Sequence, residues 1–155
     1  MKFPNPLISK ITSRKNNNSF RTLTTSHERI DFSSNDYLGF SRLKTITKAV
    51  ESASKKTMFV NGSTGSRLLS GNHAIHIEVE NKLAGFFKTP SALLFNSGYD
   101  ANLGLLSSVP QRGDIVLFDE LCHASIRDGI RLSNATSYSF KHNSISDLKK
   151  KYLNT

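Results

Sequence analysis

Two short segments of the chain carry residues whose types and spacing suit ligand chemistry, FNSGYDAN at 95–102 and LCHAS at 121–125. The first begins at the end of an apolar run, 92–95, that predicts a buried strand, and it turns at Gly98 into a predicted helix. Free backbone N–H groups at such a helix start can bind an anion. The second segment places His123 just after another apolar run. Because ligands bind at the carboxyl edge of an open parallel sheet, we predict that the anion cradle and the flat imidazole face one crevice.

Other motifs that could carry chemistry are better explained as ordinary structure. Gly62-x-x-Gly65 is not followed by Gly-Lys-Ser/Thr, so it is no nucleotide P-loop. His73 and His76 are three residues apart on a predicted helix, but no cluster of carboxylates or cysteines completes a metal site, so we expect no metal. Cys122 precedes a histidine, yet neighbouring side chains diverge, which favours a buried small residue over a nucleophile.

The elements that must position these residues follow from the apolar pattern. Apolar runs that begin near Ala92, Ile115 and Ala135 predict three strands, and helical stretches at 99–108 and 124–133 lie between them. This alternation is typical of βαβ units in a parallel sheet. The strands are continuous apolar runs, as expected when helices cover both faces of a sheet. The sequence therefore predicts an α/β fold.

The remainder of the chain is expected to form an arm, a short strand and further helices. Ile46, Ala49, Val50 and Ala53 have helical spacing, and NGSTGSRLLSGN is rich in glycine and serine, which predicts a loop. The expected elements are an arm at 1–27, a strand at 29–34, a helix at 44–56, a loop at 61–72, a helix capped by Asn72 and running to about Lys88, and a helix at 144–154.

The positive charge of the chain lies mainly at its two ends. The net charge is +9 over 155 residues, with +5 in residues 1–30, +3 in residues 141–155 and only +1 between them. This distribution indicates solvated ends rather than a basic binding face, so we expect no nucleic-acid partner.

Composition also bears on the compartment and on the extent of the protein. No segment approaches the roughly 20 apolar residues that cross a bilayer, and the N-terminus is polar, which predicts neither membrane association nor a signal peptide. A single cysteine, Cys122, fits a reducing, cytoplasmic location. Three strands make an incomplete sheet, so we expect this chain to be the front part of a larger protein.

Five motifs occur in an order and spacing that resemble a known family. They are DFSSNDYLGF at 31–40, GSTGSRLLSGN at 62–72, FNSGYDAN at 95–102, DELCHAS at 119–125 and FKHN at 140–143. Together they resemble the α-oxoamine synthases, which are transferases of fold type I that depend on pyridoxal 5′-phosphate (PLP).

The resemblance covers about residues 20–150. It implies an N-terminal arm and short strand at 1–45, followed at 46–155 by the first part of the PLP-binding large domain and its parallel sheet. It also implies that the cofactor phosphate is bound by the backbone of Gly98 and Tyr99, and that His123 stacks on the pyridine ring. In the family, phenylalanine is commoner at the position of Tyr99.

The resemblance further implies contacts with substrates and with a second subunit. Arg21 resembles an arginine that binds a substrate carboxylate, a role that suits a guanidinium fork, and His123 would also face the substrate. Ser63, Thr64 and Gly65 resemble a loop that reaches the partner subunit's active site in a homodimer.

The activity implied by the closest resemblance within the family is condensation of L-alanine with a pimeloyl thioester, carried by coenzyme A or a carrier protein, in biotin synthesis. Glycine C-acetyltransferase, 5-aminolevulinate synthase and serine palmitoyltransferase share the layout and remain alternatives. The family's Schiff-base lysine has no counterpart up to Thr155, so no catalytic residue is assigned. We expect the chain alone to be inactive, and a non-catalytic fragment is a further alternative.

Overall fold

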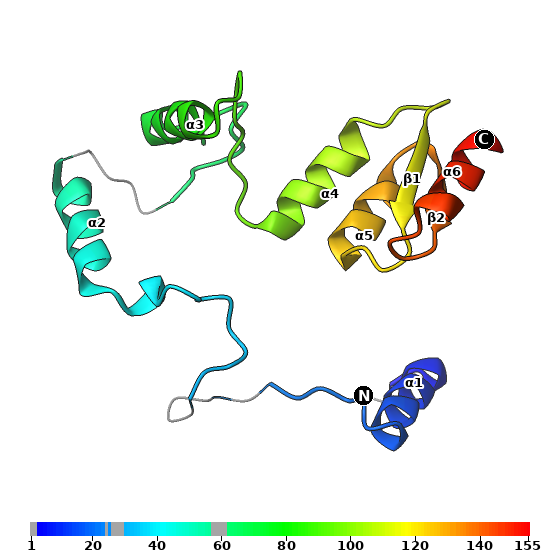
Figure 1. Ribbon diagram of the computed structural model, residues 1–155. Coiled ribbons are helices and arrows are strands. Elements are labelled where there is room, and N and C mark those ends of the chain that lie inside the picture. The colour runs from blue at the N-terminus through cyan, green and yellow to red at the C-terminus, as the bar shows by residue number, and fades with distance from the viewer. Residues whose placement is uncertain (1–2, 24, 26–29, 57–61) are drawn as a thin grey trace. The chain divides into compact units, whose positions relative to one another are not determined.

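The computed structural model forms two compact units, Met1–Phe59 and Val60–Thr155 (Figure 1). The residues that the structure describes are 3–23, 25, 30–56 and 62–155. None of the helices found among them combines the length and apolar character that a membrane-spanning helix requires.

The first unit contains the helices α1 (Asn5–Asn16) and α2 (Lys44–Lys56) and the 3-10 helix η1 (Phe40–Arg42). The prediction of a helix at 44–56 is confirmed. The sequence predicted only an arm where α1 forms, and no residue of α1 is buried. Gly39, with φ of 68°, starts η1 in the left-handed region that glycine adopts without strain.

The prediction of a short strand at 29–34 is wrong for residues 30–34, which the structure describes. Residues 32–35 form bends, because the Asp31 carboxylate accepts hydrogen bonds from the backbone N–H groups of Ser33 and Ser34 at 3.0 and 2.9 Å. An aspartate that binds the backbone a few residues ahead competes with the hydrogen bonds of a sheet. Arg29 lies outside the described residues.

The second unit contains four helices and two strands among its described residues. They are α3 (Ala74–Phe87), α4 (Gly98–Ser108), β1 (Ile115–Asp119), α5 (Ala124–Leu132), β2 (Thr136–Phe140) and α6 (Ile145–Leu153). β1 and β2 pair in parallel, from Ile115 opposite Thr136 to Asp119 opposite Phe140. The βαβ unit and the parallel α/β class are thus confirmed. α4 packs on α5, and α6 packs on both strands (Figure 1).

The first of the three expected strands does not form. Residues 92–95 are extended but pair with no strand among the described residues, and Leu93 and Leu94 are 65% and 41% exposed. The backbone N–H of Leu94 instead donates to the Glu80 carboxylate at 2.7 Å. An apolar run predicts the tendency to extend, but a strand also requires a neighbour with free backbone groups.

The closest packing in the second unit is between α4 and α5. Ile130 is the only large apolar side chain that is buried among the described residues, and Ser125 near the start of the same helix is fully buried. Gly129 is also buried, because α4 approaches it closely: a Cβ there would lie 2.8 Å from Leu106 Cβ and 2.9 Å from the Asn102 carbonyl oxygen. The close contact of two helices therefore depends on a glycine.

Candidate functional site

The start of α4 leaves two backbone donors free. The Ser97 side chain accepts from the N–H of Asp100 at 3.0 Å, and the Ser97 carbonyl accepts from the N–H of Ala101 at 3.0 Å. Within the described part of the chain, the N–H groups of Gly98 and Tyr99 have no acceptor. Even a Cβ at Gly98 would meet no atom within 4 Å. The predicted turn into a helix is confirmed, and it offers two donors at the positive end of a helix dipole.

His123 caps the start of α5, and its ring has a defined tautomer. Its Nδ1 atom accepts from the Ser125 backbone N–H at 3.2 Å and lies 2.7 Å from Ser125 Oγ. Because a backbone N–H can only donate, Nδ1 acts as an acceptor, and the proton of the neutral ring is on Nε2. Asn102 on α4 donates in turn to Ser125 Oγ at 3.0 Å. The Asn102–Ser125–His123 chain of hydrogen bonds therefore ties one ring atom, Nδ1, to both helices.

The two helix starts lie at the same end of the α4–α5 pair. Asn102 contacts Ser125, and one turn later Leu106 faces Gly129, so contacts advance by four residues on each helix and the helices run in parallel. At the N-terminal end, the rings of Tyr99 and His123 make an edge-to-face contact with centroids 6.2 Å apart and planes at 78°. The structure thus brings together the three residues that the sequence placed in one crevice.

A polar network joins the two strand ends beside this site. The Asp119 carboxylate accepts from the N–H groups of Asn143 and Leu121 at 3.0 and 2.8 Å, and from His142 Nδ1 at 2.9 Å. These bonds, with that of Asn143 the strongest influence, lower the pKa of Asp119 to about 2. The loop after β1, which leads to His123, is therefore tied to the loop after β2.

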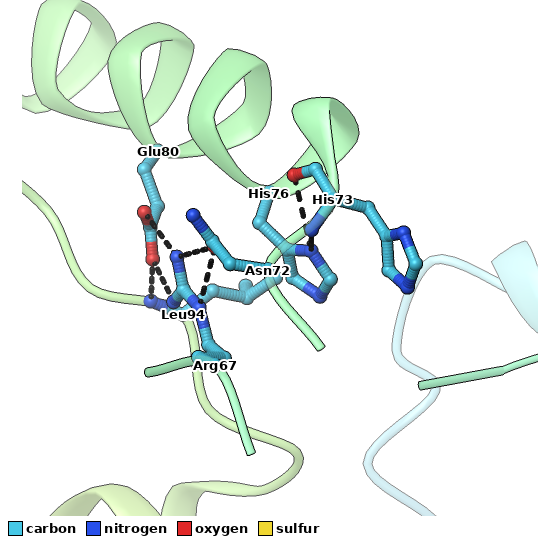
Figure 2. Close-up of polar contacts among 6 residues, drawn as sticks. All are labelled: Arg67, Asn72, His73, His76, Glu80 and Leu94. Atoms are coloured by element: carbon cyan, nitrogen blue, oxygen red, sulfur yellow. Dashed lines mark hydrogen bonds and ion pairs between the residues drawn. The ribbon is translucent and has the colours of Figure 1, made fainter. Parts of the chain in front are cut away.

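A second network holds the loop 62–72 against α3 (Figure 2). Arg67 forms a two-pronged ion pair with Glu80, with N–O distances of 2.6 and 2.9 Å, and also donates to Asn72 Oδ1 at 3.0 and 2.9 Å. The Arg67 bonds, followed by the N–H of Leu94, lower the pKa of Glu80 to about 2. One carboxylate therefore joins the loop, α3 and the segment that leads to Ser97.

The cap of α3 differs from the prediction. His73, not Asn72, occupies the N-cap position, and the His73 N–H donates to His76 Nδ1 at 3.1 Å. Asn72 is unavailable as a cap because its side-chain oxygen accepts from Arg67. Among the described residues, no group of three or more metal-binding side chains occurs, and Cys122 is half-buried and free.

The remaining predicted site residues belong to the loop 62–72 and to the first unit. In the loop, Ser63 Oγ donates to the Gly65 carbonyl at 2.6 Å, and Thr64 Oγ1 donates to the Ser70 carbonyl at 3.1 Å. A cavity of about 420 Å³ is lined by this loop, by residues 93–96 and by Asp100 in the first turn of α4. Arg21 is exposed and belongs to the first unit.

The sequence analysis missed the side chains that hold the site together. Asn102 and Ser125 lie inside the two segments first singled out, and Asp128 follows one turn after His123. The sequence did hold an indication of their role, because Asn102 and Ser125 are polar residues on the helix faces that must pack together. Which of these residues meet depends on how the two helices are aligned along their length, and the sequence alone does not determine that alignment.

Comparison with known proteins places this arrangement in a family. The model of the aminotransferase class I and II family matches residues 27–155, and the chain belongs to this family. A Bacillus licheniformis relative, provisionally named an 8-amino-7-oxononanoate synthase, is 47% identical over 146 residues, which are 94% of this chain and 38% of the relative.

Solved structures agree with the assignment. A serine palmitoyltransferase variant from S. paucimobilis, solved with bound PLP and myriocin, matches with a TM-score of 0.79 and 29% identity over 97% of this chain and 42% of that one. The 8-amino-7-oxononanoate synthase of Francisella tularensis matches with a TM-score of 0.64 and 32% identity, covering 82% and 35%. The resemblance to α-oxoamine synthases is confirmed, and the chain spans about two fifths of the length of the curated relatives it matches.

Proposed function

We propose that this chain supplies the PLP-binding part of an α-oxoamine synthase. The observation that carries the proposal is the pair of free N–H groups at Gly98 and Tyr99, with the His123 ring held at the same end of the α4–α5 pair. A phosphate fits the two donors, and a planar pyridine ring fits against an exposed imidazole. The residues present therefore suit this cofactor.

Each residue has a distinct task in the proposed site. Gly98 and Tyr99 bind the phosphate through their backbone, which fixes one end of the cofactor. His123 positions the ring through its flat face, and its Nε2–H remains free to donate to a bound ligand, since no acceptor for it occurs in the described residues. When bound, PLP would supply an electron sink for a carbanion next to nitrogen.

The proposed reaction joins L-alanine to a pimeloyl thioester, carried by coenzyme A or a carrier protein, to give 8-amino-7-oxononanoate. A carbon–carbon bond forms, the alanine carboxylate leaves as carbon dioxide, and the carbon–sulfur bond breaks to release the thiol. The named relatives support this choice of substrates. The likeness to serine palmitoyltransferase supports the alternative that another amino acid and another acyl thioester are used.

Two further roles belong to the same proposal. We assign Arg21 to the substrate carboxylate, because a guanidinium fork matches two carboxylate oxygens. We assign residues 63–65 to the partner subunit's site in a homodimer; the internal hydrogen bonds of Ser63 and Thr64 give this loop a defined shape suited to such a contact.

Binding of pyridoxine 5′-phosphate tests the proposed site. This probe has the ring and phosphate of PLP but an alcohol in place of the aldehyde, so it cannot react with surface lysines. The informative variant is His123→Asn, because asparagine retains a helix cap but lacks the flat ring. His73→Asn, the same change at the N-cap of α3, is the matched control.

We expect calorimetric titration to show that His123→Asn weakens binding of the probe by about three- to tenfold, the range of an aromatic contact. The His73→Asn variant should bind as the unmodified chain does. Equal affinity of the unmodified chain and His123→Asn would contradict the role of the ring, and no binding to the unmodified chain would contradict the proposed site.

A further inference from the structure

The Tyr99 side chain connects the first turn of α4 to α5 at two points. Its hydroxyl donates a hydrogen bond to the Asp128 carboxylate, and its ring makes the edge-to-face contact with His123. The hydrogen bond to Asp128 raises the pKa of the Tyr99 phenol above its ordinary value, because the neutral phenol is the donor. A phenylalanine at this position could make the ring contact but not the bond to Asp128.

Asp128 is well placed to act as an anchor. It lies on α5 little more than one turn after His123, and Arg131 on the same helix lies 3.6 Å from its other carboxylate oxygen. Its side chain is 39% exposed, so the bond to Tyr99 lies at the rim of the helix pair rather than in its core. The anchor can therefore be altered without opening the buried contacts at Ser125 and Gly129.

The two contacts of Tyr99 complement those that already hold His123. Ser125 holds the imidazole at a single ring atom, Nδ1. A ring held at one atom can still tilt, and a neighbouring aromatic ring that is itself fixed limits that tilt. The Tyr99 ring is fixed at both ends, by its backbone on α4 and by its hydroxyl on Asp128.

We propose that Tyr99, anchored by Asp128, is a positioning residue that sets the tilt of the His123 ring and so favours ligands with a planar ring over bare phosphate. The part that concerns ligands rests on the proposed function. The part that concerns the ring contact does not, and it can be measured in the ligand-free protein.

A charge-matched pair of variants isolates the anchor. Asp128→Asn and Asp128→Ala both remove the negative charge, but only asparagine keeps an oxygen that can accept from the Tyr99 hydroxyl. We expect Asp128→Ala to bind pyridoxine 5′-phosphate about fivefold more weakly than Asp128→Asn, the equivalent of one neutral hydrogen bond. Both variants should bind inorganic phosphate equally, because the backbone donors are unchanged. Tyr99→Phe keeps the charge of the unmodified chain and should bind the probe about fivefold more weakly than that chain.

A second measurement separates this inference from the proposed function. Nuclear Overhauser effects between the ring protons of residues 99 and 123 in the ligand-free chain should persist in Asp128→Asn and weaken in Asp128→Ala. Equal ring contacts in the two variants, or equal affinities for pyridoxine 5′-phosphate, would overturn the positioning role. If the unmodified chain binds neither probe but the ring contacts differ as expected, the proposed function fails while the anchoring of the His123 ring stands.

Discussion

The α4–α5 pair and the segment before it, residues 62–97, are stabilised by different kinds of contact. Between α4 and α5, close packing at Gly129 and a half-buried hydrogen bond between Asn102 and Ser125 join the helices over two turns. In the segment before α4, the joining contact is the polar clamp formed by Arg67 and Glu80, while Leu68 and Leu93 are 97% and 65% exposed.

This difference explains where a binding site can be precise. The α4 start and His123 lie on rigid helices whose partners are part of the described chain, so their geometry follows from packing. The loop 62–72 has its polar groups satisfied but much of its apolar surface uncovered, which is typical of a surface that another chain segment or subunit contacts. The first region suits cofactor binding, and the second suits the proposed contact between subunits.

The largest expected effect comes from filling the space between α4 and α5. Gly129→Ala places a Cβ 2.8 Å from Leu106 Cβ, so the helices must separate. We expect a loss of about 1–3 kcal/mol in the free energy of unfolding, measured by urea denaturation followed by circular dichroism.

The matched control is Gly85→Ala on α3, where a Cβ meets no atom within 4 Å. Alanine favours a helix over glycine by up to about 1 kcal/mol, so this variant should be as stable as the unmodified chain or more so. If both alanine variants changed stability equally, close packing would not be what distinguishes the α4–α5 pair.

The next effect is expected from the polar clamp. Arg67→Met keeps much of the side-chain length but removes both bonds to Glu80. We expect faster hydrogen exchange at the Leu94 amide, because the carboxylate that accepts its N–H loses its own anchor. Lys82→Met, which breaks the exposed Glu78–Lys82 pair, is the control and should leave exchange at Leu94 unchanged. Equal exchange in the two variants would show that the clamp does not order this segment.

Several elements could be predicted from the sequence because local patterns determine them. Ser97 and Ser144 precede helices and cap them through their side chains, and the apolar run at Ile115 formed its strand as predicted. The run at 92–95 has the same character but pairs with no strand among the described residues, and pairing is not a local property. The free donors at Gly98 were likewise predictable, since they follow from the start of any helix.

Acid should weaken the segment 62–97 and the Asp119 network at the strand ends in the same pH range. The folded-state pKa values of Glu80 and Asp119 are about 2, below ordinary values of about 4. A lowered carboxyl pKa means that its interactions stabilise the fold fully above about pH 4 and are lost as the pH falls toward 2. Carboxyl carbon NMR shifts recorded from pH 6 to 2 should show both groups still ionised at pH 3.5. Titration of either group near pH 4 would contradict its hydrogen bonds.

The smallest expected effect is that of the Tyr99 phenol. Its pKa is raised by Asp128, so the stabilising bond is present below about pH 10 and is lost as the pH rises through the raised pKa. The ultraviolet titration curve of Tyr99→Phe is subtracted from that of the unmodified chain. The difference should show one phenol that ionises at a higher pH than an ordinary tyrosine. A difference curve centred at or below the ordinary pKa would contradict the bond to Asp128.

The most direct test of the central claim, that the α4 start binds the cofactor phosphate, compares Gly98→Pro with Gly98→Ala. Proline suits the first position of a helix, and the extended Ser97 before it, with φ of −153° and ψ of 161°, is compatible with proline. The proline variant lacks the N–H at residue 98, whereas the alanine variant keeps it. Calorimetry should show that Gly98→Pro binds pyridoxine 5′-phosphate about tenfold to a hundredfold more weakly than Gly98→Ala, as expected for loss of a hydrogen bond to a charged group. Equal affinities would contradict the claim.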